Sequence, residues 1–370
     1  MTSGPSAGLR DECPVPELML RLRRRRRRRA GTDPVAPYRT RPSPPVKRDR
    51  QQNVADAGLV SLSPDEFREH LVLASATAGL TLPELILPEA HHVVLRGMRF
   101  HYLDWGTRGQ PPVLFLHGGG LNVHTWDLVC AALRLERHCL ALDQRGHGDS
   151  EWSPEMDYTT ESHAADLDAF VDRLGLDRFV LVGMSLGGAN ALAWAGAHSR
   201  RLAALVLVDV GPETRQAGAR KIAAFTSEAT PLDSVEDFVT RALAFNPRRN
   251  ATLLRRSLLH NLRRMPDGKW MWKYDQRHRG RGVDPAAYER RRQLLWSAVA
   301  KVACPTLVVR GAESDVFHDE DAERLSRTLS DGRWVKVEGA GHTVQGDNPA
   351  GLLVALREFL SDVTVGARRL

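Results

Sequence analysis

Cysteines are few and long apolar stretches are lacking in this sequence of 370 residues. Its four cysteines show neither C-x-x-C spacing nor a neighbouring histidine pair, so we expect no disulfide framework and no metal site. The sequence contains no run of about 18 apolar residues, the length needed to span a bilayer. The arginine run at 23–29 precedes Ala-Gly-Thr-Asp-Pro, whereas a secretory signal needs an apolar stretch there. These absences predict a cytoplasmic protein without a membrane partner.

An excess of charge is also lacking once the first 60 residues are set aside. Residues 1–60 hold 14 Lys and Arg against 6 Asp and Glu, a net charge of +8, and the remainder holds 38 against 39. The segment is rich in Pro, Arg, Ser and Gly, so we expect a disordered tail. Its seven consecutive arginines are the one feature that could bind nucleic acid, through the phosphates. The run contains no aromatic residue to stack on bases, so we do not expect a nucleic-acid partner. A start codon assigned too far upstream would explain the tail equally well.

Strand and helix patterns alternate along most of the chain. The SPDE sequence at 63–66 predicts the start of a helix that runs to about residue 78. Apolar, β-rich runs predict strands near 92–95, 99–105, 112–116, 138–142, 178–182, 203–209, 305–310 and 333–337. Helical patterns lie near 122–134, 160–174, 186–198, 319–330 and 349–361. This alternation is typical of an α/β fold, in which helices cover both faces of a parallel sheet.

One long segment interrupts the alternation, because the pattern over 212–300 is helical and lacks strands. We expect an inserted helical cap over 212–300, between core segments over 61–211 and 301–370. Its clearest helix lies near 251–265. Residues 213–300 carry 18 Lys and Arg against 9 Asp and Glu. This excess suits either an acidic substrate or a solvated outer face.

A serine stands between two glycines at the end of an apolar strand. The sequence GMSLGG at 183–188 follows the strand near 178–182 and precedes a helical run. So sharp a strand-to-helix turn needs glycine two residues to either side of the serine, because a side chain there would collide with backbone. The pattern therefore predicts Ser185 as a nucleophile above the sheet, near the positive end of the following helix.

A nucleophilic serine needs a base, and the base needs a carboxylate to orient it. Downstream, Asp315 follows the strand near 305–310 in the sequence GAESD, and His342 follows the strand near 333–337 in EGAGH. Loops at the carboxyl edge of a parallel sheet can converge on one point. We therefore expect His342 as the base and Asp315 as the acid.

A glycine-rich loop, HGGG at 117–120, ends the strand near 112–116. Acyl transfer builds negative charge on a carbonyl oxygen, and backbone N–H groups aimed at that oxygen stabilise it. We expect the N–H groups of Leu186 and Gly119 to form this oxyanion hole, with Gly120 close behind.

Candidate substrate-binding residues are less sharply defined. Besides Gly120, they include His124 and Trp126, which follow the glycine loop, and Trp272 in the segment 270–274, where aromatic residues alternate as in a short strand or extended segment. The aromatic side chains of that segment could line a pocket or pack between the cap and the core.

These motifs together resemble the α/β-hydrolase fold family, in its capped, esterase-like branch, over about residues 90–362. The DQRGHGDS turn at 143–150 belongs to the same resemblance, and in that family this turn is mainly structural. The resemblance implies a mostly parallel eight-stranded sheet with helices on both faces. Family members place the acid after one of two strands. The later position is commoner, so we prefer Asp315 to the rival Asp209.

The resemblance implies cleavage of a carboxylic ester or lactone through an acyl-enzyme on Ser185. No metal or organic cofactor is required, and the partner is a small-molecule ester, lactone or ketone. Haloalkane dehalogenases and many epoxide hydrolases of this family have an aspartate nucleophile where this chain has Ser185, so we do not expect those two activities. The alternatives are hydrolysis of a carbon–carbon bond in a vinylogous diketone and a ligand receptor without turnover. The natural substrate and the oligomeric state stay open.

Overall fold

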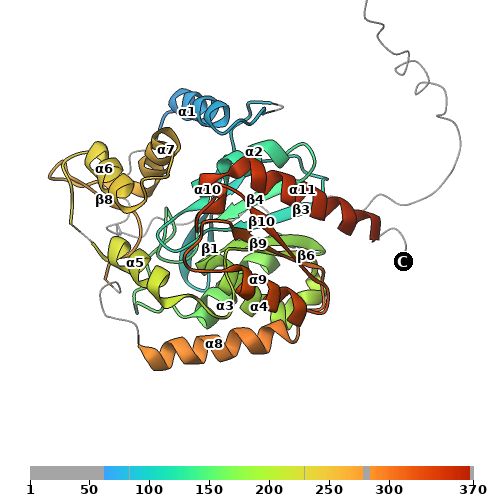
Figure 1. Cartoon of the computed structure of the whole chain (residues 1–370). Coiled ribbons are helices and arrows are strands. Elements are labelled where there is room, and N and C mark those ends of the chain that lie inside the picture. The colour runs from blue at the N-terminus through green and yellow to red at the C-terminus, as the bar shows by residue number, and fades with distance from the viewer. Residues whose placement is uncertain (1–61, 83, 229, 278–283, 367–370) are drawn as a thin grey trace, which may run out of the picture. The chain divides into compact units, whose positions relative to one another are not determined.

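The computed structural model describes residues 62–82, 84–228, 230–277 and 284–366, so the tail predicted over 1–60 lies outside the described part. An eight-stranded sheet has the order β1-β2-β4-β3-β5-β6-β9-β10 (Figure 1). Its strands are β1 (Glu89–Leu95), β2 (Met98–Asp104), β3 (Pro112–Leu116), β4 (His138–Leu142), β5 (Phe179–Met184), β6 (Leu202–Val208), β9 (Thr306–Gly311) and β10 (Gly332–Val337). All eight predicted strands are confirmed.

Strand pairing makes the sheet mostly parallel, as predicted. β1 pairs antiparallel with β2, and β2 pairs antiparallel with β4. Every neighbouring pair from β4 to β10 is parallel. The central strands β3 and β5 are buried at every position, because both faces of the sheet are covered.

Helices form a layer on each face of the sheet (Figure 1). One apolar cluster joins the sheet to α3 (Thr160–Leu174), α4 (Leu186–His198), α8 (Pro285–Val299) and α9 (Asp319–Thr328). A second joins the opposite face to α1 (Pro64–Thr77), α2 (Asp127–Leu133) and α11 (Pro349–Gly366). Short helical turns are η1 (Val123–Trp126), η2 (Ser199–Arg201) and α10 (Val344–Asp347). Within the described residues, no helix has the length and apolar character needed to cross a membrane.

The predicted start of α1 is confirmed by its capping contacts. The Ser63 hydroxyl accepts a hydrogen bond from the Glu66 N–H at 3.2 Å, and the Ser63 N–H donates to the Glu66 carboxylate at 2.8 Å. This reciprocal pair satisfies donors that the first turn of a helix leaves free.

The segment between β6 and β9 contains α5 (Gln216–Ser227), α6 (Val235–Phe245), α7 (Ala251–Asn261), β7 (Leu262–Arg264) and β8 (Trp270–Trp272) before α8. The general expectation of no strands there is wrong, since β7 and β8 pair antiparallel. β8 does lie in the alternating segment 270–274, as a short strand would. The helix predicted near 251–265 therefore ends at Asn261. α6, α7 and β8 share an apolar cluster of their own, whereas α8 packs on α4, where Ala298 lies against Gly196.

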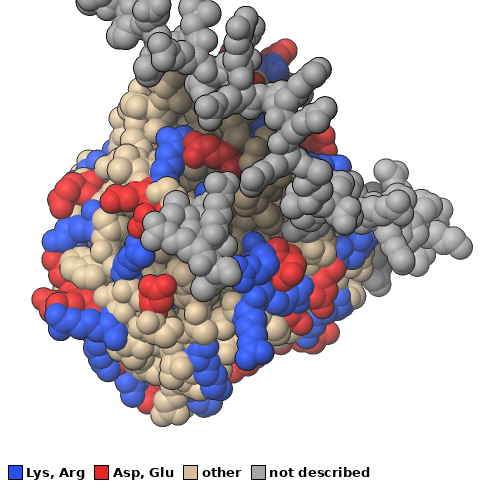
Figure 2. Space-filling model, turned by 90° about the vertical axis from the view of Figure 1, so that its right-hand side faces the viewer, with Lys and Arg blue, Asp and Glu red and all other residues tan. Residues whose placement is uncertain are grey.

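Charge is evenly distributed on the face of the molecule shown in Figure 2. Basic and acidic side chains are interspersed there. This mixture agrees with the near-neutral balance counted for the sequence beyond residue 60.

Candidate active site

Ser185 occupies a strained turn between β5 and α4. Its backbone has φ 51° and ψ −114°, a conformation that a non-glycine residue adopts only when its surroundings enforce it. The Ser185 N–H donates to the Val208 carbonyl at 3.1 Å, and the Gly187 N–H donates to the His117 carbonyl at 3.1 Å. A Cβ on Gly183 would lie 2.5 Å from the Gly187 oxygen. The glycine requirement inferred from the sequence thus has a direct steric cause.

Three polar side chains form a hydrogen-bonded series at the carboxyl edge of the sheet. His342 Nε2 lies 3.0 Å from Ser185 Oγ. His342 Nδ1 lies 2.7 Å from Oδ2 of Asp209, whose side chain is fully buried. A carboxylate accepts, so this contact favours the tautomer with the proton on Nδ1. Nε2 is then free to accept the serine proton.

Asp209 is held as a hydrogen-bond acceptor from several sides. It directly follows β6 and has φ 52°. Its Oδ1 accepts from the Gly311 N–H at 2.9 Å, and its Oδ2 accepts from the Ser314 hydroxyl at 2.5 Å. The sequence patterns do not identify the role of Ser314, although this serine directly precedes the predicted acid, Asp315.

The prediction that Asp315 orients His342 is wrong. The Asp315 carboxylate lies 3.1 Å from Lys221 Nζ, and its side chain is 52% exposed. The chain turns after β9, where the Ser314 N–H donates to the Gly311 carbonyl at 3.0 Å. This turn directs Ser314 inward and its neighbour outward. The rival Asp209 therefore takes the place next to the histidine.

The glycine loop lies against the serine, as the oxyanion-hole prediction requires. A tight turn brings the Leu121 N–H 3.1 Å from the Gly118 carbonyl. A Cβ on Gly118 would lie 3.4 Å from the Ser185 Cβ. Leu186 is the first residue of α4, and the amides of a first helical turn point out of the helix. The assignment of Leu186 and Gly119 as donors stays a prediction.

The His117 side chain holds the glycine loop in place through hydrogen bonds to Gly118 and Gln144. The Gln144 N–H donates to His117 Nε2 at 3.0 Å, so the proton is on Nδ1, 2.8 Å from the Gly118 carbonyl. Burial lowers the pKa of His117 below its ordinary value. The imidazole is therefore neutral and serves as a rigid spacer.

The turn over residues 143–150 serves as a support beside the loop. Asp143 accepts from His101 Nδ1 at 2.7 Å, from the Val123 N–H at 2.8 Å and from the Asp149 N–H at 3.0 Å. Burial acts to raise the pKa of the Asp143 carboxyl, but His101, His117 and the Asp149 N–H together outweigh it, and the pKa lies below the usual range. Asp143 is thus an ionised acceptor that ties the turn to the start of η1.

Of the predicted substrate-binding residues, the two tryptophans are packing residues. Trp126 is completely buried and packs on Phe115 with ring centroids 5.1 Å apart, so its prediction as a pocket residue is wrong. Trp272 is buried and stacks on Tyr274 at 5.6 Å, in line with the packing alternative. Gly120 has φ 79°, and a Cβ there would lie 3.4 Å from the Tyr274 ring. Gly120 therefore lies against the segment over 212–300 between β6 and β9, which we call the insertion.

His124 joins a polar cluster between η1, α2 and α7. Its ring stacks on that of His260 with centroids 3.9 Å apart, and its Nδ1 lies 3.0 Å from Asp127 Oδ2. The same carboxylate oxygen accepts from Arg256. Burial lowers the pKa of His260 well below its ordinary value, so this ring is neutral. Because the imidazoles stack and the guanidinium occupies the carboxylate, we infer no metal site from this cluster.

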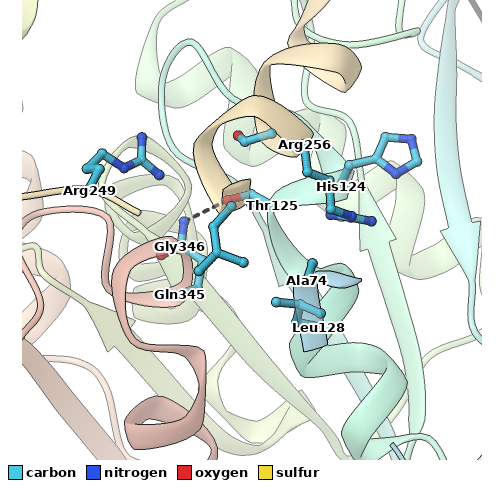
Figure 3. Close-up of a pocket in the computed structure, with 10 residues that line it drawn as sticks. Ala74, His124, Thr125, Leu128, Arg249, Arg256, Gln345 and Gly346 are labelled. Atoms are coloured by element: carbon cyan, nitrogen blue, oxygen red, sulfur yellow. Dashed lines mark hydrogen bonds between the residues drawn. The ribbon is translucent and has the colours of Figure 1, made fainter. Parts of the chain in front are cut away.

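A pocket lies beside this cluster, with about 410 Å³ of empty space that includes open solvent. His124, Arg249 and Arg256 line it, and Gln345 donates to the Thr125 hydroxyl at 2.9 Å across one side (Figure 3). The triad side chains are not among its lining residues. The pocket thus lies at the contact between the insertion and the core, next to α10, which follows His342.

Several basic side chains of the insertion pair with acids of the core. The pairs are Lys221 with Asp315, Arg248 with Glu313, Arg249 with Asp347, Arg256 with Asp127, and Lys273 with Asp149. Much of the positive excess over 213–300 therefore joins the two parts of the chain. This pairing weakens the reading of the excess as an acidic-substrate site.

Comparison with known proteins gives consistent matches. A family model described as alpha/beta hydrolase fold matches residues 111–349. The chain is 35% identical to Esterase Rv0045c of Mycobacterium tuberculosis over 81% of this chain and 99% of that protein. The crystal structure of that esterase superposes with a TM-score of 0.65, at 33% identity, over 81% of this chain and all of the other. The 3-hydroxybutyrate-oligomer hydrolase of Cupriavidus necator is 25% identical over 77% of this chain and 99% of its own length.

Proposed function

This chain belongs to the α/β-hydrolase fold family, and on that premise we propose that it is a serine hydrolase that cleaves a carboxylic ester or lactone. The observation that carries the proposal is the hydrogen-bonded series from Asp209 through His342 to Ser185. The similarity to an esterase over almost that protein's whole length supports ester cleavage.

The proposed reaction begins when His342 Nε2 takes the proton of Ser185 as its oxygen attacks the substrate carbonyl. Asp209 holds the required tautomer and stabilises the imidazolium. The N–H groups of Leu186 and Gly119 stabilise the oxyanion of the tetrahedral intermediate, by about 3 kcal/mol each. The imidazolium then donates its proton to the leaving alkoxide, and an acyl-enzyme remains on Ser185.

Deacylation repeats these steps with water as the nucleophile. His342 removes a proton from the water as it attacks the acyl carbon, and then returns a proton to Ser185 as the acid leaves. The cycle balances without a redox step or a cofactor.

The insertion over 212–300 is proposed to act as a cap that shapes the substrate pocket. Two contacts support this role: Gly218 of α5 lies against the Asp315 carbonyl, and Tyr274 lies against Gly120. The insertion thus touches both the loop after β9 and the glycine loop, and we expect a substrate to pass beneath it on the way to Ser185. Specificity for the acyl group is therefore expected to depend on the insertion.

The test is covalent labelling with a fluorophosphonate, read by intact mass, together with hydrolysis of a short-chain p-nitrophenyl ester. We expect wild type to gain one label and to turn over the ester, and Ser185→Ala to do neither while it unfolds at the same temperature. Folded wild type that takes up no label would overturn the proposal and favour the ligand receptor. Enzymes of both kinds can cleave p-nitrophenyl esters, so these esters do not distinguish ester cleavage from carbon–carbon bond cleavage. A panel of ring-cleavage dienoates does.

A further inference from the structure

We propose that Arg249 of the insertion is a positioning residue for His342 and that it acts through Asp347. The inference rests on the proposed function, since it concerns the geometry of the base. It makes the placement of the insertion a condition for full activity.

Asp347 braces the loop that carries the base. Its Oδ2 accepts from the N–H of Gly341, the residue directly before His342, at 3.1 Å. Its own N–H donates to the Thr343 carbonyl at 2.9 Å, directly after the histidine. The residue therefore holds the backbone on both sides of His342.

Arg249 reaches this carboxylate from the insertion. Its Nε lies 3.1 Å from Asp347 Oδ1, and the two side chains are only 17% and 10% exposed. Figure 3 shows Arg249 beside α10 at the edge of the pocket. A Cβ on Gly346 would lie 3.0 Å from an Arg249 nitrogen, so little space remains between them.

The backbone of Arg249 is fixed by the start of α7. The next residue, Asn250, caps that helix, with its side-chain oxygen accepting from the Thr252 N–H at 2.9 Å and the Leu253 N–H at 3.1 Å. The guanidinium is thus presented from a defined position, and a movement of α7 would carry it away from Asp347.

The charges around Asp347 also support a positioning role for Arg249. Burial raises the pKa of Asp347 above its ordinary value, while Arg249, the Gly341 N–H, His342 and Arg248 act to lower it. Loss of Arg249 removes one of these opposing contributions. A carboxyl that becomes protonated is a weaker acceptor for the Gly341 N–H.

The neighbouring Arg248 also forms an ion pair, but its pair is much more exposed than that of Arg249. Arg248 pairs with Glu313 at 2.6 Å, but their side chains are 60% and 39% exposed. Exposed ion pairs contribute little because water screens them. The mostly buried Arg249 pair is therefore the contact that couples the insertion to the base.

The test compares kcat, KM and the pH dependence of ester hydrolysis among five variants of the full chain. They are Arg249→Met, Arg249→Lys, Asp347→Asn, the double variant Arg249→Met with Asp347→Asn, and the control Arg255→Met. Arg255 lies in α7 and pairs with Glu236 through exposed side chains.

We expect Arg249→Met to lower kcat about 10- to 100-fold, the range produced by small misplacements of reacting groups, with KM nearly unchanged. The acid limb of its pH profile should move to higher pH, because without Arg249 the Asp347 carboxyl becomes protonated at a higher pH. Arg249→Lys should recover most of the rate, because it keeps the charge. The double variant should be no slower than Asp347→Asn, and Arg255→Met should match wild type.

Each contrary outcome is informative. If Arg249→Met matches Arg255→Met, the inference is overturned, while labelling of wild type at Ser185 still supports the proposed function. A loss of kcat that follows a lowered unfolding temperature, with no shift of the acid limb and no rescue by lysine, also overturns it. Absence of labelling and turnover in folded wild type would instead refute the proposed function.

Discussion

Replacing Asp209 by Asn tests the corrected triad most directly. Asp209 accepts hydrogen bonds from His342 Nδ1, the Gly311 N–H and the Ser314 hydroxyl. An amide in its place offers one acceptor oxygen and a donating NH₂ group. If the NH₂ group faces His342, the ring takes the tautomer with its proton on Nε2. That proton then points at the serine, and the ring cannot act as a base.

The expected loss is about 10⁴-fold in kcat, or about 5 kcal/mol in the activation barrier, which is typical when the base has the wrong tautomer. KM should change little, because Asp209 is buried behind the histidine. Asn is a better substitution than Ala here, since Ala would leave the buried Gly311 N–H and the Ser314 hydroxyl unsatisfied.

The matched control is Asp315→Asn, which makes the same chemical change one strand further along the sheet. Asp315 is half exposed, and its ion-pair partner within the described part of the chain is Lys221. We therefore expect less than about a twofold change in kcat and at most about 1 kcal/mol in stability. The assay is steady-state hydrolysis of a p-nitrophenyl ester, with the rate of fluorophosphonate labelling and the thermal unfolding temperature measured in parallel. Loss of activity in Asp315→Asn together with a near-normal rate in Asp209→Asn would refute the assignment.

Three further substitutions probe the supports around the triad. Gly118→Ala should lower kcat and cost about 1–3 kcal/mol of stability, because its Cβ would overlap the residue before the nucleophile; ester hydrolysis and thermal unfolding measure the two effects. Asp127→Asn should lower the free energy of unfolding in urea by about 3–5 kcal/mol, because it leaves the buried Arg256 guanidinium without its anion. Burial acts to lower the pKa of His101, but the hydrogen bond and charge of Asp143, together with the charge of Asp149, outweigh it, and the net shift is upward. This pair's stabilisation is therefore present below the ordinary pKa of His101 and is lost as the pH rises through the raised value; His101→Gln should flatten that part of a plot of unfolding free energy against pH.

Much of the fold could be predicted because its signals are local. Each central strand is an apolar run, and each covering helix has its own apolar stripe, so the eight strands and the main helices follow from periodicity. Ser185 and His342 could be chosen as candidate nucleophile and base for the same reason, since their glycine-flanked turns are short motifs. The glycines at 183 and 187 are required by backbone atoms only a few residues away or in the adjacent loop.

The acid and the insertion required the tertiary structure. Asp209 and Asp315 follow adjacent parallel strands and reach the same edge of the sheet, so sequence position favours neither on physical grounds. The turn after β9 decides between them by directing Ser314 inward. The contact of Arg249 with Asp347 joins residues 98 positions apart, and no local pattern specifies that contact. Sequence alone therefore determined the eight strands of the main sheet and the turns that carry Ser185 and His342, whereas packing between distant segments decided which carboxylate meets His342 and how the insertion meets the core.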